Sequence, residues 1–376
     1  MDKFKLIRKE YPGTQNQTYL DTATTGLLSN ASYEAMKDRL DIRYLKGINI
    51  SEYFSDWNHA DEMRKLVARM INAEKEEVFY GKDCSEMLNA IASNIEIPMG
   101  SNVVTANISF PSTRNAWLNR EKDGLEVRFV EARNGAIPFE SIKDAADENT
   151  IAISVCYVEP SSGFKHDLYK LGQLCKENDI LLVVDATQCI SAMEVDVKSM
   201  HIDFLTASTY KWMTNVFGVG IGFMAKNLLD KIQPKVVGWV GVEDRNKDFA
   251  KMTFKNNPGA QRFETGGLNW LGLLGLEKAI ENYLFLGKSD IESYILELVD
   301  YVYEEVERYE DIDIVKRFPK GNRSNIIYMK FPQSYRLNDE MLNENGIRAH
   351  VATKDSIRIG IHFYNLNSRN FIHRIS

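Results

Sequence analysis

The feature that most constrains the fold is a short apolar run that ends in an acid. Residues 180–184 are all aliphatic, and Asp185 follows them directly. The length and β-branched content of this run are those of a strand buried on both faces of a parallel sheet. Open α/β sheets bind ligands beyond the carboxyl ends of their strands, so Asp185 is expected to face a ligand site.

A lysine follows the next predicted strand. An apolar stretch around Phe204 leads to Lys211, and the glycine-spaced run at 217–223 predicts a further strand. A lysine amine with a lowered pKa can form a Schiff base with an aldehyde. A carboxylate beside a pyridine nitrogen keeps that ring protonated and able to accept electrons from a carbanion. Lys211 and Asp185 therefore predict a pyridoxal 5'-phosphate (PLP) site, although most lysines in proteins are simply solvated.

The motifs resemble those of class V aminotransferases, the fold-type I PLP enzymes that include cysteine desulfurases, isopenicillin-N-epimerase-like proteins and kynureninases. The family's Asp-Gly-Ala-Gln is matched by residues 185–188, and its Ser-Gly-His-Lys by residues 208–211. The resemblance covers nearly the whole chain. It implies an α/β fold with a mostly parallel central sheet flanked by helices, and a small α+β C-terminal domain. We expect a large PLP-binding domain over 20–270 and a small domain built from 1–19 and 271–376.

The resemblance assigns cofactor contacts near the two strand ends. Lys211 is implied to carry the Schiff base, Asp185 to pair with the pyridinium and Gln188 to bind the ring hydroxyl. Ser208 and Tyr210 match phosphate contacts, with tyrosine in place of the family's usual histidine. A phenol hydroxyl can also donate to a phosphate oxygen, so the replacement is tolerable.

Cys84 and Ser85 are expected to form the other part of a phosphate cradle. They follow a predicted strand at 78–80 and a glycine turn, and they begin a helix. The free N–H groups and positive dipole end of a helix N-terminus bind anions. The family has Ala-Thr at these positions. A serine that only caps the helix would give the same local structure.

Phe110 stands where the family has a histidine that stacks on the pyridine ring. An aromatic face can cover the ring by offset stacking, worth about 1 kcal/mol. It cannot exchange protons, which argues against a standard cysteine desulfurase.

The motif near the C-terminus resembles the part of the family's active site that binds the substrate. Arg358 matches the arginine that binds the substrate carboxylate, and its fork suits bidentate binding. Ala23 and Thr24 match a segment that approaches cofactor and substrate, although a threonine-rich turn would look the same. Cysteine desulfurases carry a persulfide-forming cysteine before this arginine, and residues 347–357 contain none.

Gly267 matches a threonine that reaches the phosphate of the neighbouring subunit's cofactor. The resemblance therefore implies a homodimer with shared sites. Symmetric homodimers are the commonest oligomers. An exposed turn without a partner is the alternative.

Composition narrows the class of protein. The 376 residues are 44% hydrophobic and 26% charged, which is ordinary for a soluble globular chain. No apolar run approaches the roughly 18 residues of a membrane span, and the first residues lack a signal-peptide pattern, so we expect a cytoplasmic protein. A net charge of −7 without a basic block argues against nucleic-acid binding. Four scattered cysteines indicate no metal site and no disulfide framework; Cys156 and Cys189 are expected to be inert core thiols.

These features predict a PLP-dependent enzyme that acts on a small amino acid. We expect the freed Lys211 to remove the Cα proton and give a quinonoid intermediate. Transamination is the preferred reaction; β-elimination by a lyase, including C–S cleavage, and epimerisation share that intermediate and stay open. A non-catalytic PLP-fold binding protein is the alternative of another class. Neither phosphate-loop nor dinucleotide-binding glycine motifs are present, which argues against an unrelated nucleotide-binding enzyme.

Overall fold

The computed structural model describes residues 2–243, 252–366 and 372. Its centre is a seven-stranded sheet in the order β2-β8-β7-β6-β5-β3-β4. Among these described strands, β8 runs in the direction opposite to all the others. The strands are β2 (Val78–Gly81), β3 (Asn102–Ala106), β4 (Glu126–Val130), β5 (Thr150–Cys156), β6 (Leu181–Asp185), β7 (Phe204–Ser208) and β8 (Gly220–Met224). The expected mostly parallel sheet is confirmed.

The side chains of each central strand belong to two hydrophobic cores, one on each face of the sheet. In β6, Leu182 and Val184 belong to one core and Val183 to the other. This follows from the alternation of side chains along a strand, and it explains why the run is apolar throughout. The apolar run at 180–184 is therefore the signature of a strand covered on both sides.

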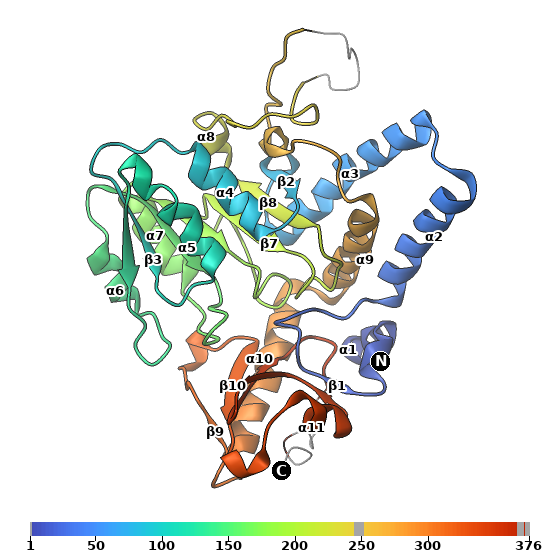
Figure 1. Ribbon diagram of the computed structural model, residues 1–376, viewed down its shortest axis with the longest axis vertical. Helices are drawn as coiled ribbons and strands as arrows, with labels where there is room; N and C mark the ends of the chain where they lie inside the picture. Colours follow the sequence, from blue (N-terminus) through green and yellow to red (C-terminus); the bar gives the residue numbers. More distant parts are fainter. Residues whose placement is uncertain (1, 244–251, 367–371, 373–376) are drawn as a thin grey trace.

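Helices cover both faces (Figure 1). Side chains of α3, α7 and α9 lie in one core, and side chains of α4, α5 and α8 lie in the other. The helices are α2 (Asn30–Lys46), α3 (Ile50–Ile71), α4 (Cys84–Asn94), α5 (Pro111–Leu118), α6 (Phe139–Ala145), α7 (Leu168–Glu177), α8 (Lys226–Leu229) and α9 (Trp270–Leu286). Among the described residues, none of the helices has the length and apolarity needed to span a bilayer.

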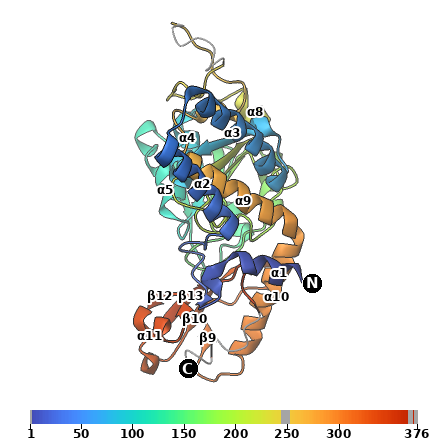
Figure 2. The same ribbon diagram turned by 90° about the vertical axis from the view of Figure 1, so that its right-hand side faces the viewer.

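A smaller unit lies at the other end of the molecule (Figures 1 and 2). Its antiparallel sheet has the order β12-β13-β10-β9. A separate parallel pair, β1 with β11, joins the N-terminal segment to this unit. Its elements are α1 (Lys3–Ile7), β1 (Thr18–Tyr19), α10 (Lys288–Val306), β9 (Asp313–Ile314), β10 (Ile326–Lys330), α11 (Asp339–Glu344), β11 (Ile347–Arg348), β12 (His350–Thr353) and β13 (Ser356–Gly360).

The expected domain boundary near residue 270 falls at the first residue of α9. Ser32 of α2 donates a hydrogen bond to the carbonyl of Gly275, so α9 lies against α2. The helix then leads directly into α10 of the smaller unit. The division of the chain into two domains stays a prediction.

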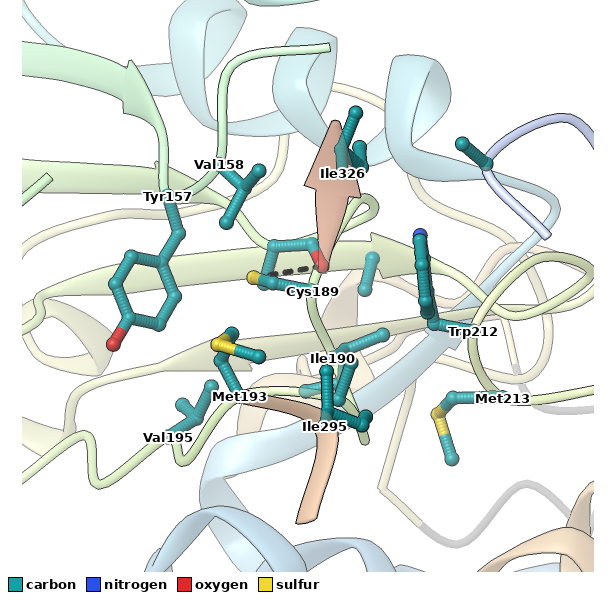
Figure 3. Close-up of a cluster of buried hydrophobic side chains, with 14 of the residues drawn as sticks. Tyr157, Val158, Cys189, Ile190, Met193, Val195, Trp212, Met213, Ile295 and Ile326 are labelled. Carbon is teal, nitrogen blue, oxygen red and sulfur yellow. Dashed lines mark hydrogen bonds between the residues drawn. The ribbon is translucent and has the colours of Figure 1, made fainter. Parts of the chain in front are cut away.

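The segment after β6 packs between the main sheet and the smaller unit. Figure 3 shows Cys189, Ile190 and Met193 from this segment close to Ile295 of α10 and Ile326 of β10. All five side chains are buried. The segment that follows the carboxyl end of β6 therefore lies at the junction of the two units.

Candidate active site

A cavity of about 210 Å³ lies at the carboxyl ends of β6 and β7. It brings together every predicted cofactor contact except Gly267: Cys84, Ser85, Phe110, Asp185, Gln188, Ser208, Tyr210 and Lys211. These residues come from α4, the start of α5, the last residues of β6 and β7, and the segments that follow these strands. The structure therefore gathers at one place residues that the sequence spreads over more than a hundred positions.

Lys211 is buried in this cavity, with only 8% of its surface exposed. Its Nζ makes no hydrogen bond or ion pair with the residues that the structure describes, and it lies 5.7 Å from the ring centroid of Phe110 and 5.6 Å from that of Tyr210. Burial lowers the pKa of Lys211; the charge of Asp185 opposes this shift, while the charge of Arg358 adds to it. The amine is therefore more readily neutral, and so more nucleophilic, than an ordinary lysine amine.

Asp185 is the last residue of β6 and is also buried. Its Oδ1 accepts a hydrogen bond from the Thr187 backbone N–H at 2.9 Å, and its Oδ2 accepts one from Thr113 Oγ1 at 3.2 Å. Cys156 Sγ donates a weaker one at 3.9 Å. Within the described part of the chain, no basic side chain forms a direct ion pair with this carboxylate. A buried carboxylate without a cation partner is costly, so a protonated pyridine ring fits this position.

Hydroxyl groups and a helix N-terminus gather at another side of the cavity. The N-cap of α4 is Asp83, whose carboxylate accepts from the Glu86 backbone N–H at 2.9 Å. Ser85 is thus not needed as a cap, and its Oγ lies 2.6 Å from Ser112 Oγ. The Cys84 backbone N–H donates to Ser208 Oγ at 3.0 Å. These donors can hold a phosphate, although Asp83 brings a negative charge to the same helix end.

Arg358 of β13 does not line this cavity, but its charge reaches Lys211. Its Nη2 donates to Thr24 Oγ1 at 2.6 Å and lies 3.5 Å from Asp21 Oδ1. The predicted pair of Thr24 and Arg358 is therefore assembled. Ala23 is fully buried, and its carbonyl accepts from Gln188 Nε2 at 3.2 Å. Because the Ala23 side chain is buried, a substrate cannot contact it; only the backbone of Ala23 contacts a residue of the cavity.

Gly267 lies apart from the other predicted residues. It lines a neighbouring cavity of about 430 Å³, together with Glu264 and Asn269. Lys82 and Gly218 line both cavities, so the two are adjacent. A role for Gly267 in a partner subunit's site stays a prediction.

Sequence reasoning missed several residues that hold the site together. Thr113 and Cys156 contact Asp185 from α5 and β5, and nothing in the local sequence of either marks that contact. Thr187 accepts from the Ser208 backbone N–H at 3.1 Å and so ties the end of β6 to the end of β7. Thr187 could have been predicted as a site residue only from its position within the motif at 185–188.

The four cysteines are all buried. Burial raises the pKa of the thiols of Cys84, Cys156, Cys175 and Cys189 above the ordinary value, so they are protonated and unreactive at neutral pH. This agrees with the expectation that Cys156 and Cys189 are core thiols, although Cys156 also lines the cavity.

The fold and the lysine–carboxylate pair define the class of PLP-dependent enzymes of fold-type I. The family model described as Aminotransferase class-V matches residues 18–368, and the chain belongs to this family. The expected family, fold and cofactor are confirmed by this match together with the similar structures.

Curated relatives include proteins named as cysteine desulfurases and proteins named as uncharacterized aminotransferases. A probable cysteine desulfurase of Pyrococcus abyssi is 31% identical, with 81% of this chain and 76% of the relative covered. An uncharacterized aminotransferase of Bacillus subtilis is 26% identical, with 77% of this chain and 75% of the relative covered. The names do not decide between amino-group transfer and C–S cleavage.

Solved structures share the fold over nearly the full length. The apo cysteine desulfurase of Thermococcus onnurineus NA1 superposes with a TM-score of 0.84 at 25% identity, covering 99% of this chain and 96% of that one. A cystine C-S lyase, solved with cysteine persulfide, superposes with a TM-score of 0.86 at 16% identity, covering 97% of this chain and 99% of that one. The second likeness is evidence for the fold alone.

Proposed function

We propose that this PLP-dependent enzyme is an aminotransferase that acts on a small amino acid. The observation that carries the proposal is the buried Lys211, whose pKa is lowered, in the same cavity as Asp185. A non-catalytic binding protein has no need for an amine held in this reactive form.

The residues of the cavity fit PLP. Lys211 Nζ is the atom that would join the cofactor aldehyde, and Asp185 would face the ring nitrogen. Phe110 would cover the ring, while Ser85 and Ser208 would bind the phosphate. When bound, the cofactor supplies an electron sink for a carbanion at the substrate Cα.

Two side chains would act on the substrate, and a third would orient one of them. Arg358 would bind the substrate carboxylate through its guanidinium group, which Thr24 orients. Lys211, once its amine is released by the incoming amino group, would take the proton from Cα as a general base. The described lining of the cavity includes no histidine, so Lys211 is the base best placed for this transfer.

A lyase that cleaves a C–S bond by β-elimination is the second candidate. It is favoured by the 31% identical relative named as a probable cysteine desulfurase. A persulfide on an enzyme cysteine is not supported, because all four cysteines are buried and none lies at 347–357. Elimination would instead release the sulfur from the substrate itself.

The test is a product screen with the PLP-loaded protein. Purified wild-type protein is incubated with a panel of amino acids, with and without a keto-acid acceptor, and keto acids, ammonia and sulfide are measured. An aminotransferase forms more than one equivalent of keto acid per site only when an acceptor is present, because the bound PLP accepts the first amino group. Release of ammonia or sulfide without an acceptor would instead establish the lyase.

The Lys211→Ala variant separates catalysis at the site from contaminating activity. It should lose product formation, and Lys316→Ala should retain it. Lys316 is a matched control because burial also lowers its pKa, while it lies outside the cavity and donates to the carbonyl of Ser161. Equal activity of wild type and Lys211→Ala would contradict the proposal.

We also propose a homodimer. Exposed apolar side chains gather at the junction of α2 and α3, including Tyr44, Leu45 and Ile50. A second copy that covers them would remove this apolar surface from water. The cytoplasmic location expected from the sequence stays a prediction.

A further inference from the structure

The amide of Gln188 is held from two sides. Its Oε1 accepts a hydrogen bond from the indole Nε1 of Trp212 at 3.0 Å, and its Nε2 donates to the carbonyl of Ala23 at 3.2 Å. The backbone carbonyl of Gln188 accepts from Asn325 Nδ2 at 2.8 Å. Gln188 lines the cavity. One amide group is therefore fixed in both position and orientation at the cavity wall.

Trp212 is itself rigidly held. Its side chain is fully buried, and its ring stacks on that of His362 with centroids 5.6 Å apart and an interplanar angle of 17°. Its backbone carbonyl accepts from Ser191 Oγ at 2.5 Å and from His362 Nε2 at 2.8 Å. Figure 3 shows Trp212 beside the buried cluster formed by the segment after β6.

His362 stays neutral in this surrounding. Burial lowers the pKa of His362 to about 3, and the bond to the Trp212 carbonyl only partly opposes this. The proton then lies on Nε2, which donates to that carbonyl. Trp212 is thus fixed through both its ring and its backbone.

We propose that Trp212 is a positioning residue that makes Gln188 a hydrogen-bond donor to the ring hydroxyl oxygen of the cofactor. This role rests on the proposed function, because it requires the protein to bind PLP. An indole N–H can only donate, so the amide oxygen must face Trp212. An amide nitrogen has two hydrogens, and Ala23 takes one. The second is left for an acceptor in the cavity.

The assigned donor has a measurable consequence. In PLP-loaded protein at low pH, the imine nitrogen of the Lys211 linkage would hold a proton and share it with the ring oxygen. At high pH that proton would be lost and the ring oxygen would carry its full negative charge. A hydrogen-bond donor would stabilise the second state more than the first. Gln188 therefore lowers the pKa at which the visible absorbance of the loaded protein changes. Loss of the donor should raise this pKa by about 1, as expected for one hydrogen bond to a charged group.

The experiment is a pH titration of the visible absorbance of four PLP-loaded proteins. They are wild type, Gln188→Ala, Trp212→Phe and the double variant. Both single variants should have a raised pKa, and the double variant should match Gln188→Ala, because Trp212 acts through Gln188. A wild-type pKa in Trp212→Phe would overturn the inference. So would a further shift when Trp212→Phe is added to Gln188→Ala.

A matched control and an isosteric variant distinguish a specific effect on the absorbance pKa from a loss of folded structure. Trp57→Phe also removes an indole from a fully buried position, but Trp57 does not line the cavity and should leave the pKa unchanged. Gln188→Glu keeps the size of the side chain and can still accept from Trp212, but a carboxylate has no hydrogen to donate, either to the Ala23 carbonyl or into the cavity. Its absorbance pKa should rise more than that of Gln188→Ala, since a carboxylate repels the anionic oxygen. No rise in Gln188→Glu would overturn the assigned donor even if Trp212→Phe fails to fold.

The two proposals fail in different ways. If wild-type protein forms no visible band with PLP, the proposed function fails and this inference falls with it. If wild type forms the band and converts an amino acid, but the variants titrate like wild type, only the role of Trp212 is overturned.

Discussion

At the scale of single residues, burial decides the chemistry of the site. Lys211 and Asp185 lie in one cavity, and the charge of Asp185 raises the pKa of Lys211 without overcoming the effect of burial. Each residue therefore keeps a group that a ligand can use, the amine as a nucleophile and the carboxylate as a partner for a cation.

Replacement of Asp185 by asparagine tests the carboxylate. An amide of the same shape cannot stabilise a protonated ring. Removing one partner of a buried ion pair costs about 3–5 kcal/mol, so turnover should fall by roughly 100-fold or more. Steady-state kinetics with the amino acid found in the product screen measures this loss.

Asp203→Asn is the control for that variant. Asp203 is a partly buried carboxyl whose pKa is raised by burial, and it accepts from the Leu182 backbone N–H, away from the cavity. Its replacement should leave turnover within a few-fold of wild type. Equal losses in the two variants would show that a general fold defect, and not the ring contact, lowers activity.

The lowered pKa of Lys211 also makes a prediction for the stability of the cofactor-free protein. Below the lowered pKa both folded and unfolded chains hold the proton, and the cost of burying the charge is fully present. As pH rises from that pKa towards 10.5, the folded protein loses the proton first and the cost disappears. The free energy of unfolding of wild type relative to Lys211→Met should therefore rise with pH in this window.

Urea unfolding at a series of pH values measures that difference. The comparison with Lys211→Met cancels the titration of other groups, which both proteins share. Lys170→Met, at an exposed lysine of α7, serves as the control for replacing a lysine that is not buried. A flat or falling difference for Lys211→Met would contradict the assigned effect of burial.

Some residues of the cavity could be predicted from the sequence, and others could not. Asp185, Gln188 and Lys211 could be predicted because each lies in a short motif at a strand end. Thr113 and Trp212 could not, because their contacts with Asp185 and Gln188 depend on how separate segments pack. Hydrogen bonds between side chains distant in the sequence leave no periodic pattern.

At the scale of elements, the junction between β5 and β10 is tightly packed. Gly163, in the loop after β5, has φ of +76°, and a Cβ there would lie 2.2 Å from the carbonyl oxygen of Ile326. Ser324 Oγ donates to the carbonyl of Gly163 at 2.7 Å. Only glycine allows this close approach of two backbones.

Gly163→Ala should therefore destabilise the protein by more than about 2 kcal/mol, since both strain and a clash with backbone are added. Gly100→Ala is the matched control. Gly100 has φ of +82°, but a Cβ at this residue would meet nothing within 4 Å, so only the strain of about 1 kcal/mol remains. Thermal unfolding compares the two. Equal melting temperatures would contradict the proposed backbone contact.

Strand positions were predictable to within a few residues, and their directions were less so. The strand expected at 217–223 is β8, which begins at Gly220 after a turn in which Gly218 has φ of +85°. Its antiparallel direction follows from the short connection from β7, which leaves no room for a crossover helix. Apolar patterning alone carries no information about direction.

At the scale of the whole molecule, the tip of the α2–α3 hairpin projects from the body (Figure 1). Tyr44 is 83% exposed, Leu45 72% and Ile50 67%. This exposed apolar surface is where the second copy of the proposed homodimer would bind.

Light scattering after size exclusion tests the dimer. Wild type should elute with twice the mass of one chain, and a Leu45→Asp, Ile50→Asp double variant should shift towards the monomer, because burying two carboxylates is costly. Met99→Asp is the control, since Met99 is also fully exposed but lies outside the hairpin. A monomeric wild type would contradict the proposed homodimer.

The central claim is that Lys211 carries the cofactor, and the most direct test is to fix that link chemically. The wild-type protein is loaded with PLP, reduced with borohydride, digested and mapped by mass spectrometry. We expect one pyridoxyl-phosphate adduct, on the peptide that contains Lys211, and none in Lys211→Ala. An adduct on another lysine, or no adduct on the Lys211 peptide of a protein that retains PLP, would contradict it.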